Sequence, residues 1–149
     1  MEINGLPVHA LVVHAAVVFA PLAGIAGILY ALVQKWRDWL RWPLVATSAI
    51  ALVTIWVAVL SGESVLEANT YGGEVGDLVH EHEEHAEQLR IAGTVFALVA
   101  FVAAWFHTRT GPVKIVLQVL LVLSGLATIG LTVLAGDYGA QVGWFGING

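Results

Sequence analysis

The chain has 149 residues, of which 58% are hydrophobic and 11% are charged, and its mean hydropathy is +0.83. Soluble domains are about half apolar and about a quarter charged, so this composition indicates an integral membrane protein. The sequence has no cysteine, which excludes disulfides, thiolate metal sites, iron–sulfur clusters and covalently attached haem.

Four long apolar segments predict an all-α fold, a four-transmembrane-helix bundle formed by a single membrane domain over residues 1–149. A helix needs about 20 apolar residues to cross the hydrocarbon core. The predicted helices cover approximately residues 7–33, 43–62, 77–107 and 112–135. Pro43 is expected at the first position of the second helix, and Asp77 is expected to cap the third. The glycine-rich stretch after Asp137 is not assigned to a helix.

The charged residues are divided between the two ends of the predicted bundle. Five of the six basic residues lie in two short loops, namely Lys35, Arg37, Arg41, Arg109 and Lys114. Ten of the eleven acidic residues lie elsewhere, in the N-terminal tip, in residues 61–90 or at Asp137. Because loops rich in Lys and Arg favour the cytoplasmic side, we expect both termini to be extracytoplasmic. The basic residues form no extended polar surface, so nucleic acid is not expected as a partner.

Two histidines, His9 and His14, lie in the first apolar segment. A polar side chain in hydrocarbon costs a few kcal/mol unless it finds a partner inside the bundle. The two are about 140° apart around a helix and therefore lie on different faces. His9 begins a face of small residues suited to close helix contact, which continues through Val13, Ala16, Ala20, Ala23 and Gly27.

The predicted third helix adds two more histidines at the same end. His82 and His85 are three residues apart and fall on one seam of that helix, and Glu81 is placed to orient His85. Charge asymmetry places this cluster, together with Asp137, at the extracytoplasmic end. Three hypotheses for the cluster stay open.

The first hypothesis is a b-type haem with two histidine ligands on facing helices, which would transfer single electrons. His14 and His85 are the preferred pair because both have apolar neighbours, and His9 and His82 are the other candidate ligands. A redox partner protein is then expected.

The second hypothesis is a non-haem centre for zinc, copper or iron, because imidazole and carboxylate suit these ions. Its candidate ligands are His9, His14, His85, Glu81 and Asp137.

The third hypothesis is that the protein is a structural or assembly subunit of a membrane complex or a homo-oligomer. In it His9 and His14 fasten the helices through hydrogen bonds to backbone or to Asp137, while His80 and His82 are solvated. His107, at the other end, is given no functional role.

We do not expect an enzyme acting on an organic substrate, because the sequence has no Ser-His-Asp spacing, phosphate-binding loop or zincin helix.

The opening segment resembles the bacterial membrane proteins grouped as domain of unknown function 2231. That family's pattern is roughly Leu-His-Pro-x-x-Val-His-Phe-Pro, and His9, Val13 and His14 match it, whereas Ala10, Ala15 and Ala16 depart from it. Further matches are Ser61-Gly62, His85 and the closing Gly136-x-x-Gly139-x-x-Val142. The resemblance implies a four-helix domain of a bacterial cytoplasmic membrane, in contact with the lipid bilayer. Some members are joined to redox modules such as Rieske domains, which favours electron transfer by analogy.

Overall fold

The computed structural model describes the backbone of residues 2–3 and 6–148 and the side chains of residues 7–145. Four long helices account for most of the described chain. They are α1 (Val8–Leu32), α2 (Arg37–Ala68), α3 (Gly73–Trp105) and α4 (Pro112–Asn148). A short 3-10 helix, η1 (Gln34–Trp36), joins α1 to α2. Two short antiparallel strands, β1 (Glu2–Ile3) and β2 (Leu6–Pro7), precede α1.

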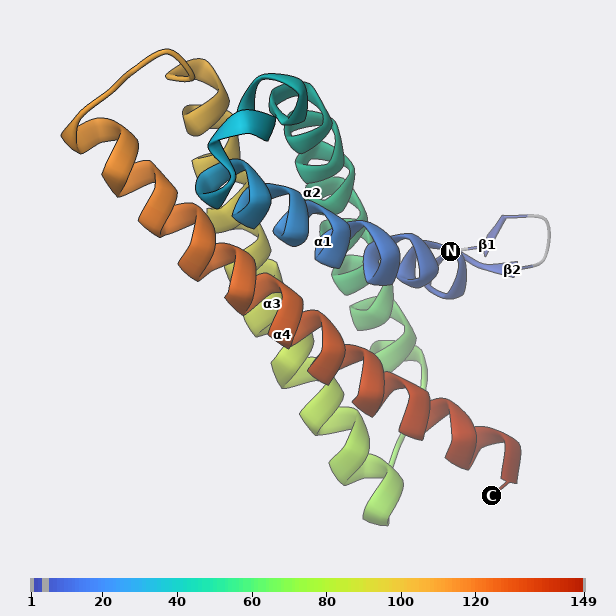
Figure 1. Cartoon of the computed structure of the whole chain (residues 1–149). Helices are drawn as coiled ribbons and strands as arrows, with labels where there is room; N and C mark the ends of the chain where they lie inside the picture. Colours follow the sequence, from blue (N-terminus) through green and yellow to red (C-terminus); the bar gives the residue numbers. More distant parts are fainter. Residues whose placement is uncertain (1, 4–5, 149) are drawn as a thin grey trace.

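The helices form a bundle in which α1 packs against α2 and α4, and α3 also packs against α2 and α4 (Figure 1). α1 and α3 therefore lie diagonally across the bundle. The start of α1 and the last turns of α4 lie at the same end of the molecule as the α2–α3 turn (Figure 1). We call this the histidine end, because it holds His9, His82 and His85. The opposite end, with η1 and the α3–α4 loop, is called the basic end.

The core of the bundle is made mainly of small side chains. On α1 the buried positions include Ala16, Ala20, Ala23 and Gly27, so the small-residue face predicted from the sequence is confirmed. Lipid offers apolar side chains no less favourable an environment than another helix, so membrane helices associate through close packing of this kind. A few large side chains fill the remaining space, and the largest fully buried ones are Tyr30, Phe96, Leu44 and Leu121.

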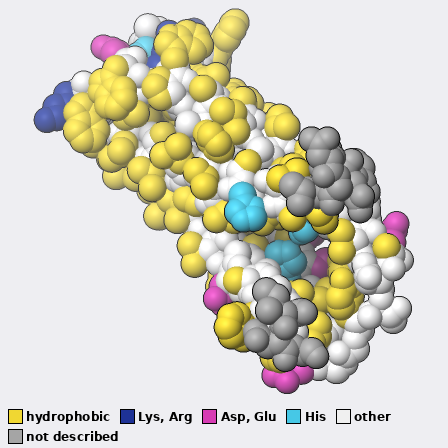
Figure 2. All heavy atoms as spheres, turned by 90° about the vertical axis from the view of Figure 1, so that its right-hand side faces the viewer, with side chains coloured by type: hydrophobic (Ala, Val, Ile, Leu, Met, Phe, Trp, Pro, Cys, Tyr) yellow, Lys and Arg dark blue, Asp and Glu magenta, His cyan; other side chains and the backbone are white. Residues whose placement is uncertain are grey.

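Large apolar side chains also cover the outside of the bundle, where Val18, Ile25, Leu123 and Val133 are each about half or more exposed. The space-filling view shows this apolar surface between two ends that carry the charged side chains (Figure 2). All four helices are long and apolar enough to cross a membrane. The predicted four-helix membrane bundle is thereby confirmed, whereas the predicted orientation of the termini stays a prediction.

The second helix begins six residues earlier than predicted, at Arg37 instead of Pro43. Pro43 lies inside the helix, where it removes one backbone hydrogen bond. Burial on the early turns compensates for this loss, because Arg37, Leu40 and Leu44 are buried at helical spacing against the rest of the bundle. The same helix continues past residue 62 to Ala68.

The third and fourth helices also differ from the predicted bounds. α3 begins at Gly73, not at Asp77, and Gly73 has a φ of +62°, a conformation that favours glycine. α4 runs to Asn148, so the glycine-rich stretch after Asp137 is helical. Its helical conformation brings Tyr138 and Gly139 against histidines of α3, a tertiary contact that outweighs the low helix propensity of glycine.

We predict that Gly24→Val destabilises the bundle. A Cβ at Gly24 would lie 2.8 Å from Cγ1 of Ile129 and 3.0 Å from the carbonyl oxygen of Gly125, both on α4. Overpacking of this kind costs about 1–3 kcal/mol, which should lower the thermal unfolding midpoint in detergent. Gly130→Val is the matched control, because nothing lies within 4 Å of a Cβ at that exposed position. Equal effects of the two substitutions would contradict the close α1–α4 contact.

The orientation can be tested with single cysteines, because the natural sequence has none. Asn69 lies in the exposed α2–α3 turn and Thr108 in the exposed α3–α4 loop. We expect Asn69→Cys in intact cells to react with a membrane-impermeant maleimide and Thr108→Cys to react only after lysis. The opposite labelling pattern would reverse the predicted orientation.

Candidate functional site

His9 joins α1 to α2 at the histidine end. Its Nδ1–H donates to the carbonyl oxygen of Ala58 at 2.9 Å and lies 3.2 Å from the hydroxyl oxygen of Ser61. Gly62 follows directly, and a Cβ there would lie 3.1 Å from Cε1 of His9. The Ser61-Gly62 pair therefore gives the imidazole both a hydrogen-bond partner and room to pack against the α2 backbone.

His82 joins α3 to α4 in the same way. Its Nδ1–H donates to the carbonyl oxygen of Ala135 at 2.8 Å, and a Cβ at Gly139 would lie 3.0 Å from Cε1 of the ring. The third hypothesis expected His82 to be solvated. That expectation is wrong, because the imidazole is partly buried between two helices.

His85 is the second histidine of α3 that faces α4. Its ring stacks on that of Tyr138, with centroids 5.1 Å apart and an interplanar angle of 21°. Its Nδ1–H donates to the backbone carbonyl of Glu81 at 2.7 Å, and the Glu81 carboxylate lies 3.9 Å away. The ring is therefore held by the backbone oxygen of Glu81, and orientation of His85 by the Glu81 carboxylate stays a prediction.

The remaining candidates lie on exposed surfaces. His14 is exposed, and its Nδ1–H donates to the carbonyl oxygen of Ala10 on its own helix at 2.6 Å. Asp137 is exposed as well and accepts a hydrogen bond from Gln141 at 2.9 Å, with no bond to His9 or His14. His80 is exposed, as expected.

His9 and His85 each lie near enough to His82 to interact with it electrostatically. Figure 2 shows histidine side chains gathered on the histidine end beside a hollow in the surface. Neither the Nε2 atom of His9 nor that of His82 has a hydrogen-bond partner among the described residues, and neither is enclosed. Each ring is therefore held by Nδ1 while its Nε2 lone pair faces accessible space.

No group of three or more histidine or carboxylate side chains that could hold a metal ion occurs in the part of the chain that the structure describes. The second hypothesis needed three or four such ligands among His9, His14, His85, Glu81 and Asp137. Among the described residues, these candidate ligands do not come together as a metal site.

The basic end holds a hydrogen-bonded network that the sequence analysis did not predict. The hydroxyl of Tyr30 lies 2.6 Å from Nδ1 of His107, and Nε2–H of His107 donates to the carboxylate of Asp38 at 2.8 Å. An Nη2–H group of Arg37 donates to the Tyr30 hydroxyl at 3.0 Å and to the carbonyl oxygen of His107 at 3.4 Å. The network ties α1, α2 and the end of α3 together.

Arg37 is the most deeply placed cation of this end, with 9% of its surface exposed. Its guanidinium lies 4.6 Å from the ring centroid of Tyr30, a cation–π contact that offsets part of the cost of burying the charge. Its Nε atom has no hydrogen-bond partner among the described residues. Tyr30 lies three residues after Gly27 on the buried face of α1, which is the one sequence signal for this network.

The network can hold His107 in either protonation state. When His107 is neutral, Nε2–H donates to Asp38 and Nδ1 accepts from Tyr30. When it is protonated, Nδ1–H donates to the Tyr30 oxygen, and the tyrosine proton can turn to the carbonyl oxygen of Ala103, 3.3 Å away. Both states keep Tyr30, His107 and Asp38 hydrogen-bonded to one another, so we describe this network as a structural lock that fastens the helices.

The fold and the two polar ends define a membrane-spanning four-helix bundle with a histidine cluster at one end. The family described as predicted membrane protein (DUF2231) matches residues 5–147, and the chain belongs to this family. No curated protein and no solved structure matched the chain.

We predict that Tyr30→Phe destabilises the protein by about 1–3 kcal/mol, because it removes the buried hydroxyl that accepts from Arg37 and pairs with Nδ1 of His107. Asp38→Asn should have little effect, because the Asp38 side chain is 99% exposed and exposed ion pairs contribute little. Thermal unfolding of the two variants in the same detergent measures the difference. A larger loss for Asp38→Asn would show that the lock depends on the exposed ion pair.

Proposed function

We propose that this membrane protein transfers single electrons through a b-type haem held at the histidine end by His9 and His82. The observation that carries the proposal is the state of the two imidazoles. Each donates Nδ1–H to a backbone carbonyl and leaves Nε2 without a partner among the described residues. A hydrogen bond of this kind fixes the tautomer and raises the basicity of a metal-bound imidazole.

The positions of the two histidines support the same proposal. His9 is on α1 and His82 is on α3, the diagonal helices of the bundle, and His9 is near enough to His82 to interact with it electrostatically. Gly62 and Gly139 pack against the rings and limit their rotation. Two axial histidines suffice for a haem, whereas a non-haem site needs a larger set of protein ligands. A bound haem b would supply one-electron chemistry there.

The proposed ligand pair differs from the pair preferred on sequence. His14 has apolar neighbours, but its imidazole is exposed and bonded to its own helix. The pairing of His14 with His85 stays a prediction, and the haem experiment below distinguishes the two pairs.

The second candidate function is that of a structural or assembly subunit, in which the histidines only fasten the helices. The hydrogen bonds from His9 to α2 and from His82 to α4 favour it directly. In that case the two unpaired Nε2 atoms would be hydrated and hold nothing. The two functions differ in whether the wild-type protein binds haem.

The test is the absorption spectrum of protein produced with ample haem, recorded oxidised and after reduction with dithionite. We expect a Soret band and a sharp reduced α band in the wild type, and we expect His9→Ala and His82→Ala to abolish both. His14→Ala and His80→Ala are matched controls on the same two helices and should keep both bands. Circular dichroism of each variant checks that the helices are retained.

A wild-type protein without a Soret band would overturn the proposal and leave the fastening role. Loss of the spectrum in His14→Ala and His85→Ala, but not in His9→Ala and His82→Ala, would replace the proposed pair by the other one.

A further inference from the structure

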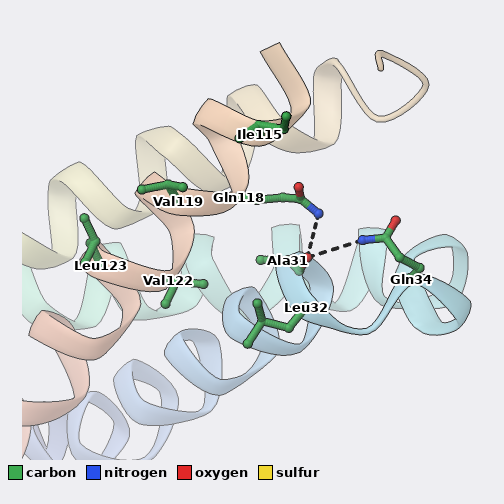
Figure 3. Close-up of a pocket in the computed structure, with 8 residues that line it drawn as sticks. All are labelled: Ala31, Leu32, Gln34, Ile115, Gln118, Val119, Val122 and Leu123. Carbon is green, nitrogen blue, oxygen red and sulfur yellow. Dashed lines mark hydrogen bonds between the residues drawn. The ribbon is translucent and has the colours of Figure 1, made fainter. Parts of the chain in front are cut away.

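A groove runs along the outside of the bundle near the basic end, between the last turn of α1 and the first turns of α4 (Figure 3). Its volume is about 480 Å³, within the range of about 300–1,000 Å³ typical of small-molecule sites. Apolar side chains line most of it, namely Leu32, Ile115, Val119, Val122 and Leu123. None of its eight lining side chains is charged.

The end of the groove nearest η1 is polar. Gln118 from α4 and Gln34 from η1 both point at the carbonyl oxygen of Ala31 and donate to it, at 2.7 Å and 3.4 Å (Figure 3). That carbonyl belongs to the last turn of α1, where no intrahelical partner exists, so the two amides act as a C-terminal cap. Lys114 donates to the side-chain oxygen of Gln34 at 2.7 Å and places a cation at the mouth of the groove.

The charge around this mouth is mainly positive. Five basic residues belong to the basic end, and Asp38, in the first turn of α2, is the one acidic residue there. The carboxylate of Asp38 is paired with His107. An anion at the mouth would therefore meet Lys114 without a competing carboxylate in the groove lining.

The groove has the length of one lipid chain in one leaflet. From Ile115 to Leu123 a helix rises about 12 Å, which is close to the half-thickness of the hydrocarbon core, about 15 Å. Trp36, Trp39 and Trp42 are exposed at the same end, as expected for side chains at the headgroup boundary. The polar mouth would thus lie at headgroup level and the apolar part in the acyl region.

We infer that this groove is a binding site for one anionic phospholipid. Its acyl chain lies along Val119, Val122 and Leu123, and its phosphate group meets Lys114 beside the amides of Gln34 and Gln118. Charge complementarity at the mouth selects an anionic over a zwitterionic headgroup, because a Lys near the membrane surface favours anionic lipid by about fivefold.

The test is native mass spectrometry of the full chain released from bilayers that contain equal amounts of phosphatidylglycerol and phosphatidylcholine with identical acyl chains. We expect the wild type to retain one phosphatidylglycerol molecule. Lys114→Gln should reduce the preference for that lipid by about fivefold. Arg109→Gln is the matched charge control, because Arg109 lies over Phe106 in the adjacent loop, whereas Lys114 donates to the groove-lining Gln34.

A second pair of variants tests the acyl part of the site. Val119→Trp fills the groove and should abolish retention, whereas Val133→Trp places the same side chain on an exposed surface of α4 outside the groove and should not. Three results would overturn the inference. They are equal retention of the two lipids, an equal effect of Arg109→Gln and Lys114→Gln, or a lipid-free dimer that Val119→Trp dissociates.

Discussion

The structure depends on one face of α1. Small side chains on this face allow α2 and α4 to approach closely, and this contact replaces the hydrophobic driving force that lipid cannot supply. Gly24 shows how tight the contact is, since even a methyl group there would meet α4 backbone at 3.0 Å. The same face carries His9 at one end and Tyr30 at the other. Both polar sites of the protein are therefore positioned by the packing that forms the bundle.

The two sites differ in what they leave unpaired. At the basic end, Tyr30, His107 and Asp38 satisfy one another, and an added proton is accommodated without loss of a bond. At the histidine end, His9 and His82 each use one nitrogen for a neighbouring helix, and the other nitrogen has no partner in the part of the chain that the structure describes. A closed network stabilises a fold, whereas an imidazole with a free lone pair in a partly apolar setting can bind a ligand. This contrast is the reason to place a function at the histidine end.

Much of the histidine end could be predicted from the sequence. The charge asymmetry and the number of helices predicted that the histidines lie at one end of the bundle. The spacing of His82 and His85 predicted that both face a neighbouring helix. His14 was preferred over His9 as a haem ligand because its neighbours in the sequence are apolar. The small-residue face is the better predictor of burial, because residues that share a face with alanine and glycine point into the bundle. His14 shares its face with Val18 and Ile25, which are exposed.

The sequence by itself determined the membrane class, the four helices and the buried face of α1, because these follow from apolar length and from periodicity within one helix. Only the tertiary structure decided the partners that lie far apart in the chain. Tyr30 and His107 are 77 residues apart and form their bond through the packing of α1 beside the end of α3. The glycine-rich end of α4 packs on α3 through Tyr138 and Gly139. Such contacts depend on how helices are placed in space, which no local pattern of residues records.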